Sequence, residues 1–162
     1  MFVIGIDPGK KGALAAIQDD GTITLHQLPD NALDTVNLLL DSYISKGACH
    51  IFLEKAQAMS IGGVRQGVSS MFNYGTGFGI LLGIIAALKI PHTLVHPKTW
   101  CKEMHAGTTT GNAKERSLEA ARRLYPNVQL VRPRCTKPDE GYVDALLIAG
   151  YGQRVLTGKK HE

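Results

Sequence analysis

Two short apolar segments that each end on a carboxylate constrain this fold more than any other feature. Residues 2–7 (FVIGID) and residues 49–54 (CHIFLE) have the apolar character of buried strands and finish on Asp7 and Glu54. Asp-Pro-Gly after the first segment is also good turn chemistry, so Asp7 has two interpretations. Glu54 is harder to explain as a turn residue, because Lys55 points to the other face and is a poor partner for it. The two acids are therefore candidates for a shared site.

The remaining pattern predicts strands and longer helices in the order β-β-β-α-β-α-β-α-α, with a short helix directly after the last strand. An Asp-Gly pair at residues 20–21 favours a short hairpin, so the first three strands form an antiparallel meander. The predicted strands are 2–7, 12–18, 22–28, 49–54 and 91–95. The predicted helices are 31–46, 70–89 (or from 74), 97–102, 113–124 and 139–156, with Asn31 capping the first and Asn112 the fourth. This order indicates an α/β fold with a mixed sheet covered by helices. We expect one domain over residues 1–157 and a disordered tail at residues 158–162.

Charge is distributed unevenly along the chain. The net charge is +4 and the isoelectric point about 9.0. Residues 98–137 hold nine Lys or Arg against three Glu, a net charge of +6, whereas the rest of the chain carries −2. A basic segment beside a mildly acidic body indicates a polyanionic partner, although a solvated surface accounts equally well for the charge alone.

The composition also excludes several classes of protein. Three widely spaced cysteines suggest no disulfide framework, which favours a reducing cytoplasm. No segment resembles a signal peptide, and the longest apolar run, residues 78–88, is too short to span a bilayer, so we expect no membrane partner. Gly79 and Gly83 share one helix face and permit close approach of another backbone. Packing inside the protomer is the favoured interpretation and a dimer seam the other, and the two are not mutually exclusive.

The last predicted helix adds three acids, Asp139, Glu140 and Asp144. Glu140 and Asp144 are four residues apart, so their like charges lie about 5–6 Å apart on one face. A cation between the acids would remove that repulsion, and Mg²⁺ favours carboxylate oxygens together with substrate phosphate. The first-turn acids also have a simpler interpretation as partners of the helix dipole.

Three segments together resemble a known family. Gly5-Ile6-Asp7-Pro8-Gly9, the strand ending in Leu53-Glu54, and Asp144-Ala145-Leu146-Leu147-Ile148-Ala149 are similar to RuvC-type Holliday-junction resolvases of the RNase H-like nuclease superfamily. The resemblance extends from Phe2 to about Leu156 and implies a mixed five-stranded sheet with helices on both faces. The opening motif alone also resembles actin-like ATPases, but those proteins need two such domains and 162 residues cannot supply them.

The resemblance implies a metal site made of carboxylates. Bacterial relatives commonly place a fourth acid three residues before the acid on the last helix, which here is Gly141. Glu140 is the best substitute, and Asp139 remains a rival. The family uses Mg²⁺, commonly two ions with Mn²⁺ as a substitute, and no organic cofactor. The implied metal ligands are Asp7, Glu54, Glu140 and Asp144.

The resemblance also implies residues that contact DNA. Lys102 and Lys114 match lysines beside the scissile phosphate, although exposed helix lysines are equally common. An aromatic residue after the second acid is either Phe72 or Tyr74, and the preceding glycine-rich loop carries Arg65. We expect structural roles for three other residues, Trp100 in the core and His92 and His96 around a strand. The predicted DNA contacts are Arg65, Phe72, Tyr74, Lys98, Lys102, Lys114, Arg132, Arg134 and Lys137.

The function implied by the resemblance is resolution of four-way DNA junctions. A two-fold homodimer would suit a substrate that receives two symmetric nicks. Two metal ions can activate water and stabilise the leaving oxygen of a phosphodiester. The alternatives are another RNase H-like nuclease acting on RNA, hybrids or branched DNA, a junction-binding protein without catalysis, and an actin-like phosphate-binding fragment.

Overall fold

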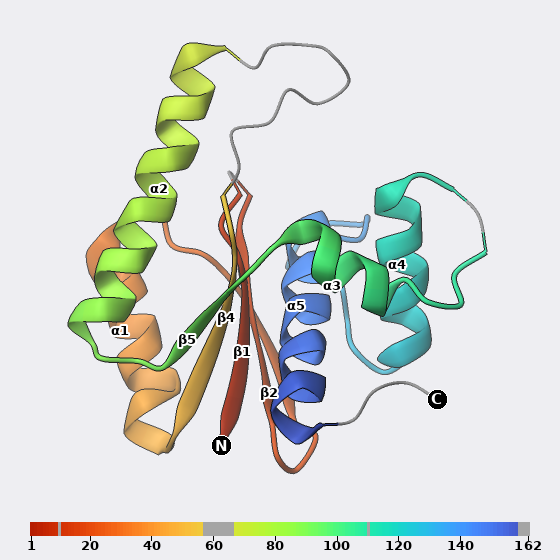
Figure 1. Cartoon of the computed structure of the whole chain (residues 1–162), viewed down its shortest axis with the longest axis horizontal. Helices are drawn as coiled ribbons and strands as arrows, with labels where there is room; N and C mark the ends of the chain where they lie inside the picture. The colour runs from red at the N-terminus through yellow and green to blue at the C-terminus, as the bar shows by residue number, and fades with distance from the viewer. Residues whose placement is uncertain (10, 57–66, 110, 159–162) are drawn as a thin grey trace.

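The fold is built on a five-stranded mixed sheet with the strand order β3-β2-β1-β4-β5 (Figure 1). The computed structural model describes residues 1–9, 11–56, 67–109 and 111–158. The strands are β1 (Phe2–Asp7), β2 (Ala13–Gln18), β3 (Ile23–Gln27), β4 (Cys49–Glu54) and β5 (His92–Val95). The helices are α1 (Ala32–Ser42), the 3₁₀ turn η1 (Ile44–Lys46), α2 (Val68–Ala87), α3 (Pro97–Met104), α4 (Ala113–Leu124) and α5 (Glu140–Thr157). The predicted α/β class and the predicted order of elements are confirmed.

The central strand β1 sets the position of the first two acids. It is antiparallel to β2 and parallel to β4, with Ile6 paired to Leu53. Asp7 and Glu54 follow these paired residues, so both carboxylates leave the sheet at the carboxyl ends of adjacent parallel strands. In open α/β sheets ligands bind beyond such strand ends.

Helices cover both faces of the sheet, as the sequence predicts (Figure 1). One apolar cluster joins the sheet to α3, α4 and α5, and a second joins the opposite face to α1 and α2. The close contact of α5 with β1 depends on Gly5, because a Cβ at this position would collide with the Ala145 carbonyl and the Ala149 amide. A glycine in the central strand therefore lets α5, which carries Asp144, lie directly against the sheet.

Side-chain caps fix the starts of several helices. Asn31 accepts a hydrogen bond from the Asp34 amide at the start of α1, and Asn112 forms a capping box with Glu115 at the start of α4. His96 caps α3 by accepting from the Lys98 amide at 3.1 Å. The predicted caps of α1 and α4 and the structural role of His96 are therefore confirmed.

The helix α2 differs most from prediction. It begins at Val68, earlier than either predicted start, and only Leu81, Ile84 and Ile85 are buried along its 20 residues. The prediction that Gly79 and Gly83 pack inside the protomer is wrong, because a Cβ at either position would meet nothing within 4 Å. Gly79 and Gly83 are exposed although Leu81, Ile84 and Ile85 of the same half are buried, so the glycines lie on a face of α2 turned away from the core. The amino-terminal half of α2 projects beyond the sheet (Figure 1).

The end of the first helix also differs from prediction. The first helix ends at Ser42, and a separate 3₁₀ turn follows at Ile44–Lys46, whereas one continuous helix was expected over 31–46. Within the described residues, α2 is also long and apolar enough to cross a membrane by length and composition. The sequence predicts no membrane-spanning segment, because its longest apolar run, residues 78–88, leaves out the first ten residues of this helix.

Candidate active site

Asp7 combines a turn with a position in the candidate site. Its Oδ1 accepts a hydrogen bond from the Gly9 amide at 3.0 Å, so the turn chemistry predicted for Asp-Pro-Gly is present. Burial raises the pKa of Asp7, the Gly9 hydrogen bond lowers it, and the charges of Asp139 and Glu140 raise it further. Both interpretations of Asp7 therefore describe the same side chain.

The Glu54 carboxylate is held by Trp100, a residue of the helix α3. The Trp100 indole N–H donates to Glu54 Oε2 over 2.7 Å. Burial raises the pKa of Glu54 to about 7; the Trp100 bond lowers it, and the charges of Asp7 and Asp144 raise it. Trp100 is 2% exposed, as a core residue should be, but its hydrogen bond escaped the sequence analysis. No spacing rule connects two residues that are 46 positions apart.

Asp144 completes a group of three interacting carboxylates. The pKa of Asp144 is raised to about 7, chiefly by burial and also by the charges of Asp7 and Glu140. A hydrogen bond with the Ser117 side chain and the charge of Lys114 act in the opposite direction. The structure therefore brings Asp7, Glu54 and Asp144 within electrostatic reach of one another, from two strands and one helix.

Glu140 lies at the exposed edge of this group. Its carboxylate forms an ion pair with the Lys114 ammonium at 2.8 Å, and both side chains are largely exposed. The hydrogen bond to Glu140, followed by its charge, raises the pKa of Lys114. Two residues predicted separately, one as a metal ligand and one beside the scissile phosphate, are therefore in direct contact.

Asp139, the rival of Glu140, has a different set of partners. It caps α5 by accepting from the Tyr142 amide at 3.0 Å, and it pairs with the Arg132 guanidinium at 2.6 Å. Arg132 also donates to the Lys11 carbonyl at 2.8 Å. These contacts occupy Asp139 in fixing the start of the helix, which favours Glu140 as the acid available to a ligand.

The missing acid three residues before Asp144 has a steric explanation. A Cβ at Gly141 would collide with the Lys11 carbonyl from the turn between β1 and β2. The backbone of that turn thus fills the space into which a longer side chain would project. Glycine at this position lets the turn that follows Asp7 pack against the first turn of α5.

The predicted DNA contacts are divided among several surfaces. Tyr74 lies beside the acids, and burial, together with the charges of Glu54 and Asp7, raises its pKa to about 12. Phe72 projects into solvent with 72% of its surface exposed. Arg132 contacts Asp139 and the Tyr142 ring, which argues against a phosphate contact, and Arg65 lies outside the described residues. The remaining predicted contacts, Lys98, Lys102, Lys114, Arg134 and Lys137, are exposed.

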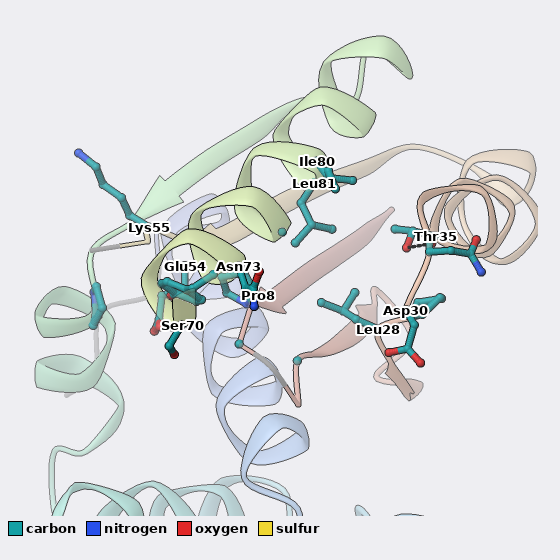
Figure 2. Close-up of a pocket in the computed structure, with 17 residues that line it drawn as sticks. Pro8, Leu28, Asp30, Thr35, Glu54, Lys55, Ser70, Asn73, Ile80 and Leu81 are labelled. Carbon is teal, nitrogen blue, oxygen red and sulfur yellow. Dashed lines mark hydrogen bonds between the residues drawn. The ribbon is translucent and has the colours of Figure 1, made fainter. Parts of the chain in front are cut away.

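A cavity of about 820 Å³ opens beside Glu54. It lies between the turn after β1, the start of α1 and the inner side of α2. Figure 2 shows Glu54, Ser70 and Asn73 at one end of the cavity, with Leu28, Asp30 and Thr35 at the other. The predicted orientation of Lys55 agrees with this view, in which its side chain extends away from Glu54 (Figure 2). Glu54 is therefore open to a substrate from the α2 side, and Pro8 and Gly9 bring the turn after Asp7 to the same cavity.

The chemistry of the carboxylate group fits a divalent cation. Across the described residues, no three His, Cys, Asp or Glu side chains already converge as a set of metal ligands. Asp7, Glu54 and Asp144 nevertheless present oxygen donors whose burial and mutual repulsion disfavour their charged forms. A hard cation such as Mg²⁺ prefers oxygen ligands and would offset that repulsion.

Comparisons with known proteins agree with this architecture at the level of the fold. A search of solved structures finds Thermus thermophilus RuvC in complex with a Holliday junction substrate, with a TM-score of 0.62 and 16% identity. A second Thermus thermophilus RuvC structure has a TM-score of 0.55 and 17% identity. Each comparison covers 99% of this chain and 98% of the other. No protein-family model and no curated protein sequence matches the chain. The resemblance to RuvC-type resolvases is thus confirmed in the fold.

Proposed function

We propose that this protein is a structure-selective endodeoxyribonuclease that resolves four-way DNA junctions by metal-dependent hydrolysis of phosphodiesters. The observation that carries the proposal is the grouping of Asp7, Glu54 and Asp144 at one sheet edge within a RuvC-type fold. One of the structural neighbours is a RuvC bound to a Holliday junction substrate, which supports the choice of DNA.

The residues of the site have separable roles in the proposed reaction. Asp7, Glu54 and Asp144 would hold the metal, with Glu140 as the fourth ligand, and one or two Mg²⁺ ions would activate water and neutralise developing charge on the phosphate. Lys114 lies beside Glu140 and its charge reaches Asp144, so it is placed to attract a phosphate at this edge. Lys102 is exposed on α3, and its role in phosphate binding remains part of the proposal.

The proposed substrate surface combines the basic segment with the cavity. Tyr74 faces the acids and is placed to contact a base or sugar near the cleaved bond. Exposed cations on α3, on α4 and before α5 would hold the flanking phosphates, and their contribution should weaken with added salt. The three cysteines are free thiols, consistent with work in a reducing cytoplasm.

The proposed active form is a homodimer, because two symmetric cuts in a four-way junction need two equivalent sites. Along α2, a stripe of glycines and apolar side chains is exposed in the protomer. This open surface supports a dimer seam along α2.

The test is incubation with a synthetic four-way junction and Mg²⁺, compared with matched duplex, flap and RNA–DNA hybrid substrates. We expect paired nicks near the junction centre and little cleavage of the linear duplex. Asp7→Asn and Asp144→Asn should abolish cleavage while retaining junction binding. Asp41→Asn removes an exposed acid from α1 and serves as the matched control, with unchanged activity expected.

The substrate panel also separates the other interpretations. Preferential cleavage of hybrids or flaps would replace junction resolution with another nuclease activity on the same fold. Unchanged cleavage by Asp7→Asn would refute the assigned site, and junction binding without cleavage at any divalent metal would indicate a binding protein.

A further inference from the structure

Behind the acids, two helices form a buried polar connection that the proposed reaction does not yet use. Among the described residues, only Thr35, His105 and Ser117 are buried polar residues, and His105 and Ser117 contact each other. His105 Nε2 lies 3.0 Å from Ser117 Oγ, and the two residues are 4% and 5% exposed. A buried pair of this kind is costly to place unless its hydrogen bonds are satisfied.

The His105–Ser117 pair lies close to two of the carboxylates, Asp144 directly and Glu54 through Trp100. The Ser117 side chain lies close enough to Asp144 to stabilise its carboxylate and lower its pKa. The His105 ring packs edge-to-face on the Trp100 ring, with the centroids 5.8 Å apart. Trp100 in turn donates its indole N–H to Glu54. His105 therefore contacts Trp100, which donates to Glu54, and Ser117, which lies beside Asp144.

The direction of the hydrogen bonds follows from the number of available protons. A serine hydroxyl carries one hydrogen, and the Asp144 carboxylate is an acceptor when it is ionised. If Ser117 donates to Asp144, the His105 Nε2–H must donate to Ser117 Oγ. This fixes the His105 tautomer and gives Ser117 one defined orientation in the buried space.

We propose that Trp100, Ser117 and His105 are positioning residues that hold Glu54 and Asp144 for divalent-metal binding. The inference rests on the proposed function, because it assigns a purpose to contacts around the same carboxylates. Hydrogen bonds that orient metal-binding carboxylates typically contribute about 10–100-fold to metal affinity. None of the three side chains touches the metal or the substrate in this scheme.

Trp100 also supplies the measurement. It is the only tryptophan in the chain, and its N–H contacts a proposed metal ligand. Titration of the DNA-free protein with Mg²⁺ should change its fluorescence along a saturating curve, and Glu54→Gln should remove the response. This readout is independent of cleavage.

Two substitutions isolate the contribution of the buried pair. Ser117→Ala should raise the half-saturating Mg²⁺ concentration about 10-fold or more, in both fluorescence and cleavage. Cleavage at saturating Mg²⁺ should recover most of its rate, since the metal ligands themselves remain. His105→Leu should act similarly, whereas His105→Gln, which retains an N–H donor, should restore part of the affinity.

A second histidine–hydroxyl pair provides the matched control. His50 Nε2 lies 2.9 Å from Thr93 Oγ1, near the strand ends opposite the acids. Thr93→Val and His50→Leu remove a contact of the same two chemical groups, here exposed to solvent, and should leave the Mg²⁺ response unchanged. Circular dichroism of each variant checks that the fold is retained.

For Trp100→Phe, which lacks the fluorescent probe, calorimetric titration with Mg²⁺ replaces fluorescence. A Mg²⁺ affinity within twofold of the parent for Ser117→Ala and Trp100→Phe would overturn the inference. A protein that binds Mg²⁺ with the expected variant pattern but cleaves no junction would instead refute the proposed function.

Discussion

The helices α5 and α2 are similar in length and glycine content but have opposite surroundings. In α5, ten residues are buried, and Gly141, Gly150 and Gly152 each have a neighbour in the space of the missing Cβ. In α2, three residues are buried, and Gly75, Gly77, Gly79 and Gly83 face open space. Glycine thus permits close packing within the protomer in one helix, whereas the same residue type in the other helix has no such contact.

The difference separates the two tasks of the fold. On the α5 side, tight packing of the helix against the sheet keeps the carboxylates in position. The α2 side leaves an apolar surface that none of the described residues covers. Glycine in an exposed helix costs about 0.5–1 kcal/mol relative to alanine, so a series of four calls for a compensating contact.

The largest effect should come from closing the contact between β1 and α5. Gly5→Ala places a methyl group against the Ala145 carbonyl and the Ala149 amide, which belong to backbone and cannot rotate away. We expect a loss of about 3 kcal/mol or more in the free energy of unfolding, at the upper end of overpacking effects. Urea denaturation followed by circular dichroism measures it. Stability within 1 kcal/mol of the parent would show that α5 does not depend on this contact.

The next largest effect should appear on α2, if its exposed glycines form the dimer seam. Gly83→Glu adds a charged side chain in open space, so the protomer should fold normally. The dimer dissociation constant should rise at least about 10-fold, or about 1.4 kcal/mol. Light scattering across a concentration series measures the change.

Leu33→Glu is the matched control for this experiment, because Leu33 is an exposed apolar residue on α1. It should leave the dimer intact. Equal loss of dimer in both variants would show a general effect of added charge, and no loss in Gly83→Glu would place the seam elsewhere.

The sequence was most informative where the signals for a helix or strand lie within that element. Apolar runs, the Asp-Gly hairpin and the Asn caps predict nearly all elements, because each signal is local. The site was predictable in its carboxylates, since Asp7 and Glu54 end strands and Asp144 precedes an apolar helix face. The bond from Trp100 to Glu54 was not predictable, because it depends on how α3 crosses the end of the sheet.

The glycines show the same limit of prediction from sequence. Gly79 and Gly83 have the spacing of a close-packed face, yet the structure leaves them uncovered. Gly141 carries no local signal, and its requirement becomes visible only when the Lys11 carbonyl lies beside it. Spacing indicates which residues share a face, whereas contacts decide what that face meets.

A smaller effect should be a pH dependence of the folding stability that arises from Glu54 and Asp144. Glu54 and Asp144 each have a pKa of about 7 in the fold, well above that of an exposed carboxyl. The folded state therefore binds more protons than the unfolded state between about pH 4 and 7, and stability falls as pH rises through this window. Without divalent metal, the melting temperature should be several degrees lower at pH 8 than at pH 5.5.

Mg²⁺ should reverse part of this loss, with a larger gain at pH 8 than at pH 5.5, because the carboxylates are ionised there. Asp144→Asn should flatten the pH dependence, whereas Asp41→Asn should leave it unchanged. A melting temperature that rises with pH in the metal-free protein would contradict the assigned burial of the acids.

The smallest effect should come from Gly79→Ala, and its sign tests the comparison between the two helices. In an isolated protomer, alanine has room on α2 and should stabilise the helix by about 0.5–1 kcal/mol. In a dimer whose backbones meet along this face, the same methyl group should weaken association. Unfolding measured at low concentration and association measured at high concentration should therefore change in opposite directions. A gain under both conditions would mean that no second backbone approaches Gly79, and the glycines of α2 would then need another explanation.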